Sequence, residues 1–162
     1  MQYCLTPIGV IHVSADDETV KKSLDGVPGI VEIFQEFAEG LRGIDGFSHL
    51  IIISYLHKTS DQHRQVLTVK PRRLIKLGLP PTEVPEVGVF CTDSPHRPNP
   101  IAITIVKLLK REGRYLHVEG VDLFNNTPVI DIRPYTPERK VGDIKLPEWY
   151  LNLLKTCRSL KN

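Results

Sequence analysis

The sequence predicts a mainly β protein, a small antiparallel β-barrel with short helical turns and a C-terminal helix. Apolar, β-branched runs of strand length recur along the chain and are separated by turns that contain glycine, proline or asparagine. The chain contains no internal repeat and no low-complexity tract. Many short strands joined by turns are typical of small barrels, because a closed barrel leaves no strand edge unpaired.

Length, charge and cysteine content narrow the class of protein. The 162 residues are most simply one domain, 1–162, with room for a substantial core. Its 21 basic and 19 acidic residues leave a net charge of +2, too small by itself to indicate nucleic-acid binding. Cys4, Cys91 and Cys157 form no CxxC pair, which argues against disulfides and zinc and fits a reducing compartment. We see no signal-peptide pattern and no apolar run of ~20 residues, so we expect a cytoplasmic protein without a membrane partner.

The first third of the chain alternates strands and turns. Residues 5–13 are apolar and predict an opening strand, and 30–34 predict a second one. Between them, 14–29 are polar and predict a surface loop or a short helical turn. Three glycines in 38–46 predict a turn or one helical turn. Residues 50–56 are continuously apolar and indicate a strand buried on both faces, although their period alone does not exclude a buried helix.

The middle of the chain contains two polar segments, each of which has two possible roles. His57 and Lys58 follow the apolar run, where they either line a site or are an ordinary strand exit. Residues 65–70 predict a short strand. The basic cluster that follows either binds phosphate groups of a nucleic acid or lies on a solvent-exposed loop. That cluster comprises Lys70, Arg72, Arg73 and Lys76.

The second half contains the clearest hairpin. Residues 101–109 and 115–121 predict two strands joined at Glu112-Gly113, with Ile101, Ile103 and Ile105 on one face. A second turn at 125–128 precedes a strand at 129–133. Proline and Glu148 at its start and apolar residues at helical spacing predict an amphipathic helix over 147–160.

A proline-rich loop at 92–100 stands between two apolar strand runs. Its three prolines fix φ and remove backbone donors, so it cannot join a regular ladder. The result is either a preorganised polar site that presents Ser94, His96, Arg97 and Asn99, or a rigid connector in which Arg97 and Asn99 tie loops together.

Several familiar sites are excluded. The sequence has no glycine-rich phosphate loop and no nucleophile elbow, and its six histidines lack metal-ligand spacing, so we expect no metal. Asp131 and Arg133 share a strand face and are read as a structural ion pair rather than a site wall. We expect the residues at 57–58, 93–100 and 125–128 to converge at one end of the barrel.

Particular strings resemble the TsaA-like/TrmO family from about residue 7 to 138. They are SPHRPNPI at 94–101, HVEGVD at 117–122, TPVIDIRPY at 127–135, and the shorter IGVI at 8–11, FAEGL at 37–41 and GFSHL at 46–50. The resemblance implies a methyltransferase on a small β-barrel that uses S-adenosylmethionine and acts as a homodimer. It implies methylation of N6 of N6-threonylcarbamoyladenosine at position thirty-seven in the tRNA anticodon loop.

The resemblance also implies site residues. Cofactor contacts fall on His57, Lys58, Asp93, Ile103, Asn125, Asn126, Thr127 and Pro128. The chain departs from the family pattern in four places: Asp93 replaces an arginine, Ala102 a glycine and Asn125-Asn126 an Asp-Gly pair, while no Pro-Arg-Gln string occurs between 14 and 28.

The loop then supplies the candidate catalytic residues. The nucleophilic nitrogen needs to lose a proton, and His96 or Asp93 is the hypothesised acceptor, with Arg97 and Asn99 positioning the modified base. Basic residues near 70 and 110 are candidates for tRNA backbone contact: Lys70, Arg72, Arg73, Lys107, Lys110, Arg111 and Arg114. The alternatives are a divergent methyltransferase of another RNA or a small molecule, and a non-catalytic cofactor-binding module.

Overall fold

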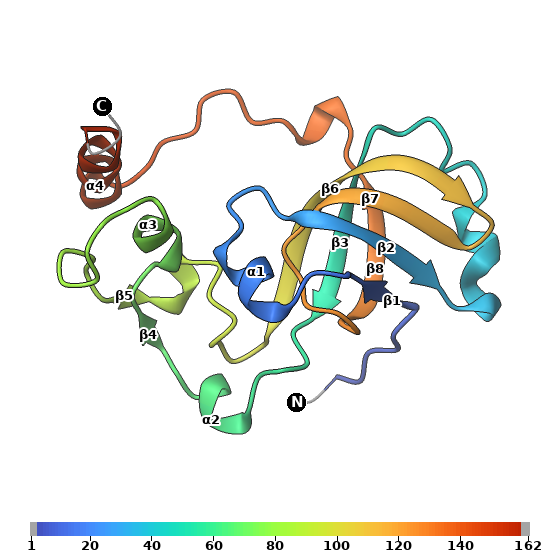
Figure 1. The fold of residues 1–162 in the computed structure, drawn as a ribbon, viewed down its shortest axis with the longest axis horizontal. Helices are drawn as coiled ribbons and strands as arrows, with labels where there is room; N and C mark the ends of the chain where they lie inside the picture. The colour runs from blue at the N-terminus through green and yellow to red at the C-terminus, as the bar shows by residue number, and fades with distance from the viewer. Residues whose placement is uncertain (1–2, 160–162) are drawn as a thin grey trace. The chain divides into compact units, whose positions relative to one another are not determined.

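Six antiparallel strands close into a barrel in the order β1–β2–β7–β6–β3–β8, as Figure 1 shows for the computed structural model, which describes residues 3–159. The predicted antiparallel barrel is therefore confirmed. The barrel strands are β1 (Gly9–His12), β2 (Val27–Ile33), β3 (His49–Tyr55), β6 (Ile101–Glu112), β7 (Tyr115–Val121) and β8 (Pro128–Pro134). Between and after them lie α1 (Asp17–Lys22) and the 3₁₀ helices η1 (Gln35–Leu41) and η3 (Pro137–Arg139).

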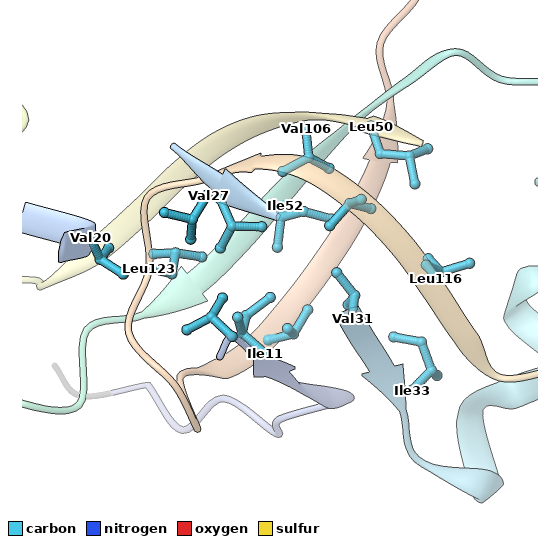
Figure 2. Packing of buried hydrophobic residues seen from close by; sticks show 14 of the residues in the cluster. Ile11, Val20, Val27, Val31, Ile33, Leu50, Ile52, Val106, Leu116 and Leu123 are labelled. Atoms are coloured by element: carbon cyan, nitrogen blue, oxygen red, sulfur yellow. The ribbon is translucent and has the colours of Figure 1, made fainter. Parts of the chain in front are cut away.

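The barrel interior is filled by aliphatic side chains from alternating strand positions. Ile52, Val31 and Leu116 are fully buried, and Ile11 and Val106 are buried almost as completely (Figure 2). Because successive side chains of a strand point to opposite faces, each strand contributes about every second residue to this core.

One prediction about β3 is wrong. Its side chains alternate between buried and partly exposed, so it is buried on one face and not on both. Leu50, Ile52 and Ser54 point inward, whereas Ile51 and Ile53 lie on the outer face opposite Ile105 and Ile103 of β6. The apolar run was continuous because the outer surface of the barrel is itself apolar here.

The predicted hairpin is confirmed as β6 and β7, which pair from Lys107–Glu119 to Glu112–Tyr115. Gly113 has a φ of +62° in its turn, a conformation in which glycine avoids the steric cost of a side chain. The predicted ion pair of Asp131 and Arg133 is also present, at 3.1 Å between Oδ2 and Nε.

The residue contacts divide the chain into two compact units. The first comprises residues 1–58 and 101–139 and contains the barrel; the second comprises 59–100 and 140–162. No observation tests the expectation of a single domain directly, so it stays a prediction.

The second unit has its own small core. It contains α2 (Asp61–Arg64), β4 (Thr68–Val69), α3 (Arg72–Lys76), β5 (Val87–Gly88), η2 (Val89–Cys91) and α4 (Glu148–Ser159). Leu74, Leu79, Val84 and Cys157 are buried together, with Trp149 packed against them. The apolar stripe of the predicted C-terminal helix therefore covers this core.

Element boundaries in the second unit differ from the expected ones. The strand expected over 65–70 is only two residues long, because Ser60 caps a helical turn that ends at Gln65. The helix expected over 147–160 begins at Glu148, and residue 160 lies outside the described part. Within residues 3–159, no helix has the length and apolar character needed to cross a bilayer.

Candidate functional site

In the barrel unit, the end of β3 and the β7–β8 turn meet at one barrel end. Lys58 lies 5.0 Å above the ring of Phe124, the residue before the turn, and donates a hydrogen bond of 2.5 Å to Asp17 at the start of α1. Lys21 of α1 approaches the same ring at 5.7 Å. Lys58 therefore lies beside the residue that precedes the turn at 125–128, and the expected convergence of 57–58 with the turn itself stays a prediction.

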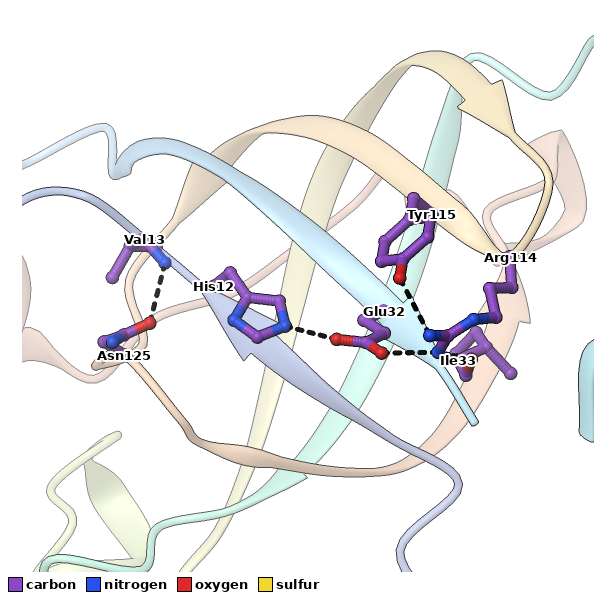
Figure 3. A network of polar contacts seen from close by, with 7 residues as sticks. All are labelled: His12, Val13, Glu32, Ile33, Arg114, Tyr115 and Asn125. Carbon is purple, nitrogen blue, oxygen red and sulfur yellow. Dashed lines mark hydrogen bonds and ion pairs between the residues drawn. The ribbon is translucent and has the colours of Figure 1, made fainter. Parts of the chain in front are cut away.

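The turn at 125–128 is held by hydrogen bonds to β1. Asn125 Oδ1 accepts from the backbone N–H of Val13 at 3.2 Å (Figure 3), and the N–H of Asn126 donates to the carbonyl of Ile11 at 2.8 Å. Thr127 is buried, and its hydroxyl donates to the carbonyl of Phe124 at 2.8 Å. The backbone of the turn is thus fixed before any ligand arrives.

The imidazole of His57 has a buried nitrogen without a hydrogen-bond partner among the described residues. Its Nδ1 is buried and has no hydrogen-bond partner among the described residues, and the same is true of the hydroxyl of Ser54 on β3. Burial, and next the charge of Lys58, lowers the pKa of His57, while Asp17 opposes that shift. A buried acceptor or donor without a partner is costly, so His57 Nδ1 is a natural contact for a polar ligand.

Ile103 is not part of this group. Its side chain is 71% exposed on the outer face of β6, and its neighbours Ala102 and Thr104 face the interior. The expected cofactor contact of Ile103 stays a prediction.

The proline-rich loop belongs to the second unit, and hydrogen bonds within the loop brace it. Thr92 Oγ1 accepts from the N–H of Ser94 at 3.2 Å, and Ser94 Oγ accepts from the N–H of His96 at 3.2 Å. Arg97 donates to the carbonyl of Thr92 at 3.1 Å, so its guanidinium braces the loop that carries it. Asp93 and Asn99 are exposed. The convergence of this loop with the barrel residues stays a prediction.

His96 stacks on His63 of α2. The ring centroids are 4.1 Å apart and the ring planes differ by 8°. Burial first, then His63 and Arg72, lowers the pKa of His96, so its imidazole is neutral at physiological pH. Arg64, next to His63, donates to the carbonyl of Pro98 at 3.2 Å and ties α2 to the loop.

A separate cavity of about 520 Å³ lies at the opposite end of the barrel. Its lining includes Ile33 at the end of β2, Phe37 of η1, Leu50 at the start of β3 and Asp131. None of the predicted site residues lines it.

Sequence reasoning missed the partners of the site residues. Asp17 lay in a segment predicted to be loop or helical turn, and His63 and Phe124 carry no motif. A charged residue just after a helix cap and a histidine in a short helix are common on surfaces, so no pattern in the sequence singles them out.

The fold and the candidate site define a class of protein: a small closed antiparallel β-barrel with polar residues held in place at one end. The family model for the tRNA-methyltransferase O N-terminal domain matches residues 19–140. This chain belongs to that family.

Known relatives agree with this placement. A probable S-adenosyl-L-methionine-binding protein of Pyrococcus abyssi is 37% identical over 147 residues, which cover 88% of this chain and 73% of that protein. The human tRNA (adenine(37)-N6)-methyltransferase is 39% identical over 106 residues, 65% of this chain but 22% of the enzyme. The crystal structure of TrmO from Pseudomonas aeruginosa superposes with a TM-score of 0.66 at 27% identity, covering 90% of this chain and 62% of that one. The chain thus spans less than two thirds of the length of the human enzyme and of the Pseudomonas protein.

Proposed function

We propose that this chain is a methyltransferase that uses S-adenosylmethionine and methylates N6 of N6-threonylcarbamoyladenosine at position 37 in the tRNA anticodon loop. The observation that carries the proposal is that Lys58, next to His57, lies over the ring of Phe124, the residue before the turn at 125–128, whose Asn125 is bonded to Val13. These are the positions at which the family resemblance implies cofactor contacts. The name of the human relative, a tRNA (adenine(37)-N6)-methyltransferase, supports the same reaction class.

The residues present fit a cofactor of this kind. S-adenosylmethionine combines an adenine, ribose hydroxyls and an amino acid, and all three need hydrogen-bond partners. The buried Nδ1 of His57 lacks a partner among the described residues, and a ligand would satisfy it. Lys58 and the side-chain amides of Asn125 and Asn126 are further hydrogen-bond donors among the residues at which the resemblance implies cofactor contacts.

In this proposal, a residue of the proline-rich loop accepts the proton that the substrate nitrogen loses. The cofactor, when bound, supplies an electrophilic methyl group. The substrate nitrogen is a carbamoylated amine, so it becomes nucleophilic only as its proton leaves. Neutral His96 is the first candidate to accept that proton, directly or through water, and the exposed carboxylate of Asp93 is the second. Arg97 and Asn99 would orient the base, and positioning supplies much of the rate in a displacement of this kind.

Methyl transfer from labelled cofactor to tRNA, followed by nucleoside mass spectrometry, tests the proposal. We expect tRNA from a strain that lacks this chain to accept methyl groups at N6 of the threonylcarbamoyl nucleoside. His96→Ala or Asp93→Asn should lower turnover by about 10²-fold or more if that residue is the base, with cofactor affinity retained. Unchanged turnover in both variants would remove both as bases, and absence of transfer to any tRNA would refute the function.

The second candidate is a transferase with another substrate, or a module that binds the cofactor without catalysis. The four departures from the family pattern favour it, above all Asp93, which is exposed and places a negative charge where the family has a positive one. Transfer of label to a small molecule but not to tRNA would establish the first of these alternatives. Cofactor binding without transfer would establish the second.

We also propose a homodimer located in the cytoplasm. Ile103 and Ile105 are 71% and 51% exposed on the outer face of β6, and the half-buried Ile51 and Ile53 lie beside them on β3. An apolar sheet face of this kind fits a second copy of the chain. Cys4, Cys91 and Cys157 are free thiols, which supports a reducing compartment. Sedimentation at increasing concentration, with Ile103→Lys as the variant, tests the dimer.

A further inference from the structure

The net charge of +2 conceals two units of opposite sign. The unit of residues 59–100 and 140–162 carries eleven basic and six acidic side chains, a difference of +5. The barrel unit carries ten basic and thirteen acidic side chains, a difference of −3. A polyanion is therefore attracted by the second unit and repelled by the barrel.

Each of the basic residues of the barrel hairpin has a carboxylate partner. Lys110 lies 2.6 Å from Glu112, and Lys107 lies 3.8 Å from Glu119. Arg111 likewise contacts Asp45 at 3.2 Å and also donates to two backbone carbonyls.

The guanidinium of Arg114 makes still more contacts within the protein. It pairs with Glu32, and it donates to the carbonyl of Ile33 at 3.0 Å and to the hydroxyl of Tyr115 at 2.8 Å (Figure 3). Glu32 is also bound by His12 at 2.6 Å. A phosphate at this hairpin would have to compete with these pairs.

The basic residues that precede and begin α3 are in a different state. Arg72 and Arg73 are exposed, and no carboxylate oxygen of residues 3–159 lies within 4.0 Å of either guanidinium. Lys70 donates to the carbonyl of Pro81 at 2.7 Å, which orients its ammonium group without neutralising it. The ion pair of Arg64 with Asp61 is as long as that of Lys107 with Glu119, 3.8 Å, but Asp61 is 95% exposed against 52% for Glu119, so water screens the charge of Asp61 more completely.

This basic surface adjoins the proline-rich loop. Arg64 is bonded to Pro98 of the loop, and Arg72 is close enough to His96 to affect its titration. His63, the residue before Arg64, stacks on His96 of the loop. Glu86 is engaged with the hydroxyl of Thr68, so it does not pair with the arginines.

We propose that Arg64, Lys70, Arg72 and Arg73 form the phosphate-contacting surface of this protein, and that the basic hairpin of β6 and β7 takes no part. The ligand is the sugar–phosphate backbone of RNA, which brings its target base to the neighbouring loop. This inference rests on the proposed function and adds to it the surface that holds the substrate. Phosphate contacts position a nucleic acid without reading its sequence.

Two matched variants test the assignment. Arg72→Gln with Arg73→Gln removes two positive charges from the α3 surface, and Lys107→Gln with Lys110→Gln removes two from the hairpin. Since both double variants change the net charge equally, a general charge effect would weaken RNA binding equally. Binding of an anticodon stem-loop RNA is measured by fluorescence anisotropy between about 50 and 200 mM salt. Unfolding midpoints confirm that both proteins are folded.

We expect the α3 variant to bind about ten-fold more weakly near physiological salt, with the slope of log K against log salt reduced by about 1.4 to 1.8. The hairpin variant should keep the wild-type slope. Equal losses in both variants, or a full slope in the α3 variant, would overturn the assignment while leaving the methyltransferase proposal intact. If the wild-type protein neither binds this RNA nor methylates tRNA, the proposed function itself fails and the surface assignment with it.

Discussion

At the scale of single residues, the titration of His57 reports the electrostatics of the candidate site. Lys58 lowers the pKa of His57 and Asp17 raises it, while burial is the largest cause of the net decrease. We therefore expect His57 to titrate below 6.5, its ordinary value. Lys58→Met should raise this pKa and Asp17→Asn should lower it further. Measurement of the imidazole C–H resonances by NMR over a pH series distinguishes the two directions.

The sign of this shift also fixes the effect on stability. A histidine whose pKa is lower in the folded state binds fewer protons there than in the unfolded chain, so protonation favours unfolding. The stability of the folded protein should then decrease as the pH falls from 6.5 through the folded pKa. An unfolding midpoint that rises as the pH falls through that range, or a His57 that titrates above pH 6.5, would show that the imidazole is not buried as described.

The sequence could propose residues for the candidate site but not their partners. The pattern indicated only that His57 and Lys58 end an apolar run and that Asn125 to Pro128 form a turn, and the family resemblance implied their cofactor contacts. The contact of Lys58 with Asp17, 41 residues away, depends on how the chain closes, and no local pattern encodes it. The stacking of His63 on His96 is of the same kind.

At the scale of elements, the β7–β8 turn depends on the backbone of Asn126. This residue has a φ of +65°, the left-handed region that asparagine tolerates better than other residues with a side chain. A branched side chain there costs about 1–2 kcal/mol, whereas glycine has no such cost. We expect Asn126→Val to reduce the free energy of unfolding by that amount and Asn126→Gly to leave it unchanged or raise it slightly. Urea unfolding of the three proteins measures this, and equal midpoints would contradict the strained turn.

Elements were predicted well where hydrophobic periodicity and turn chemistry agreed. Glu112-Gly113 between two alternating runs gave the β6–β7 hairpin, and a proline followed by an apolar stripe gave α4. Periodicity failed for β3, because side chains outside a barrel can be apolar as well as those inside. It also failed near residue 65, where the capping of α2 by Ser60 decided the local structure.

At the scale of the whole molecule, each compact unit has a core of its own, and the chain order does not reveal it. Leu74 and Cys157 share one small core although 82 other residues lie between them in the sequence. Composition and length favoured one domain because both units together have the size of an ordinary one. Long-range contacts of this kind become visible only once the chain is folded.

Two buried leucine-sized residues test whether the units unfold separately. Ile52 lies in the barrel core and Leu74 in the core of the second unit, and both are fully buried. Truncation of either to alanine should cost about 2–5 kcal/mol, since both removed side chains leave cavities. If the units are separate cooperative structures, Leu74→Ala should speed amide hydrogen exchange in α3 and α4 but not in β3 and β6, and Ile52→Ala should do the reverse. If instead each variant speeds exchange equally throughout residues 3–159, the chain is one cooperative domain, as its length alone predicts.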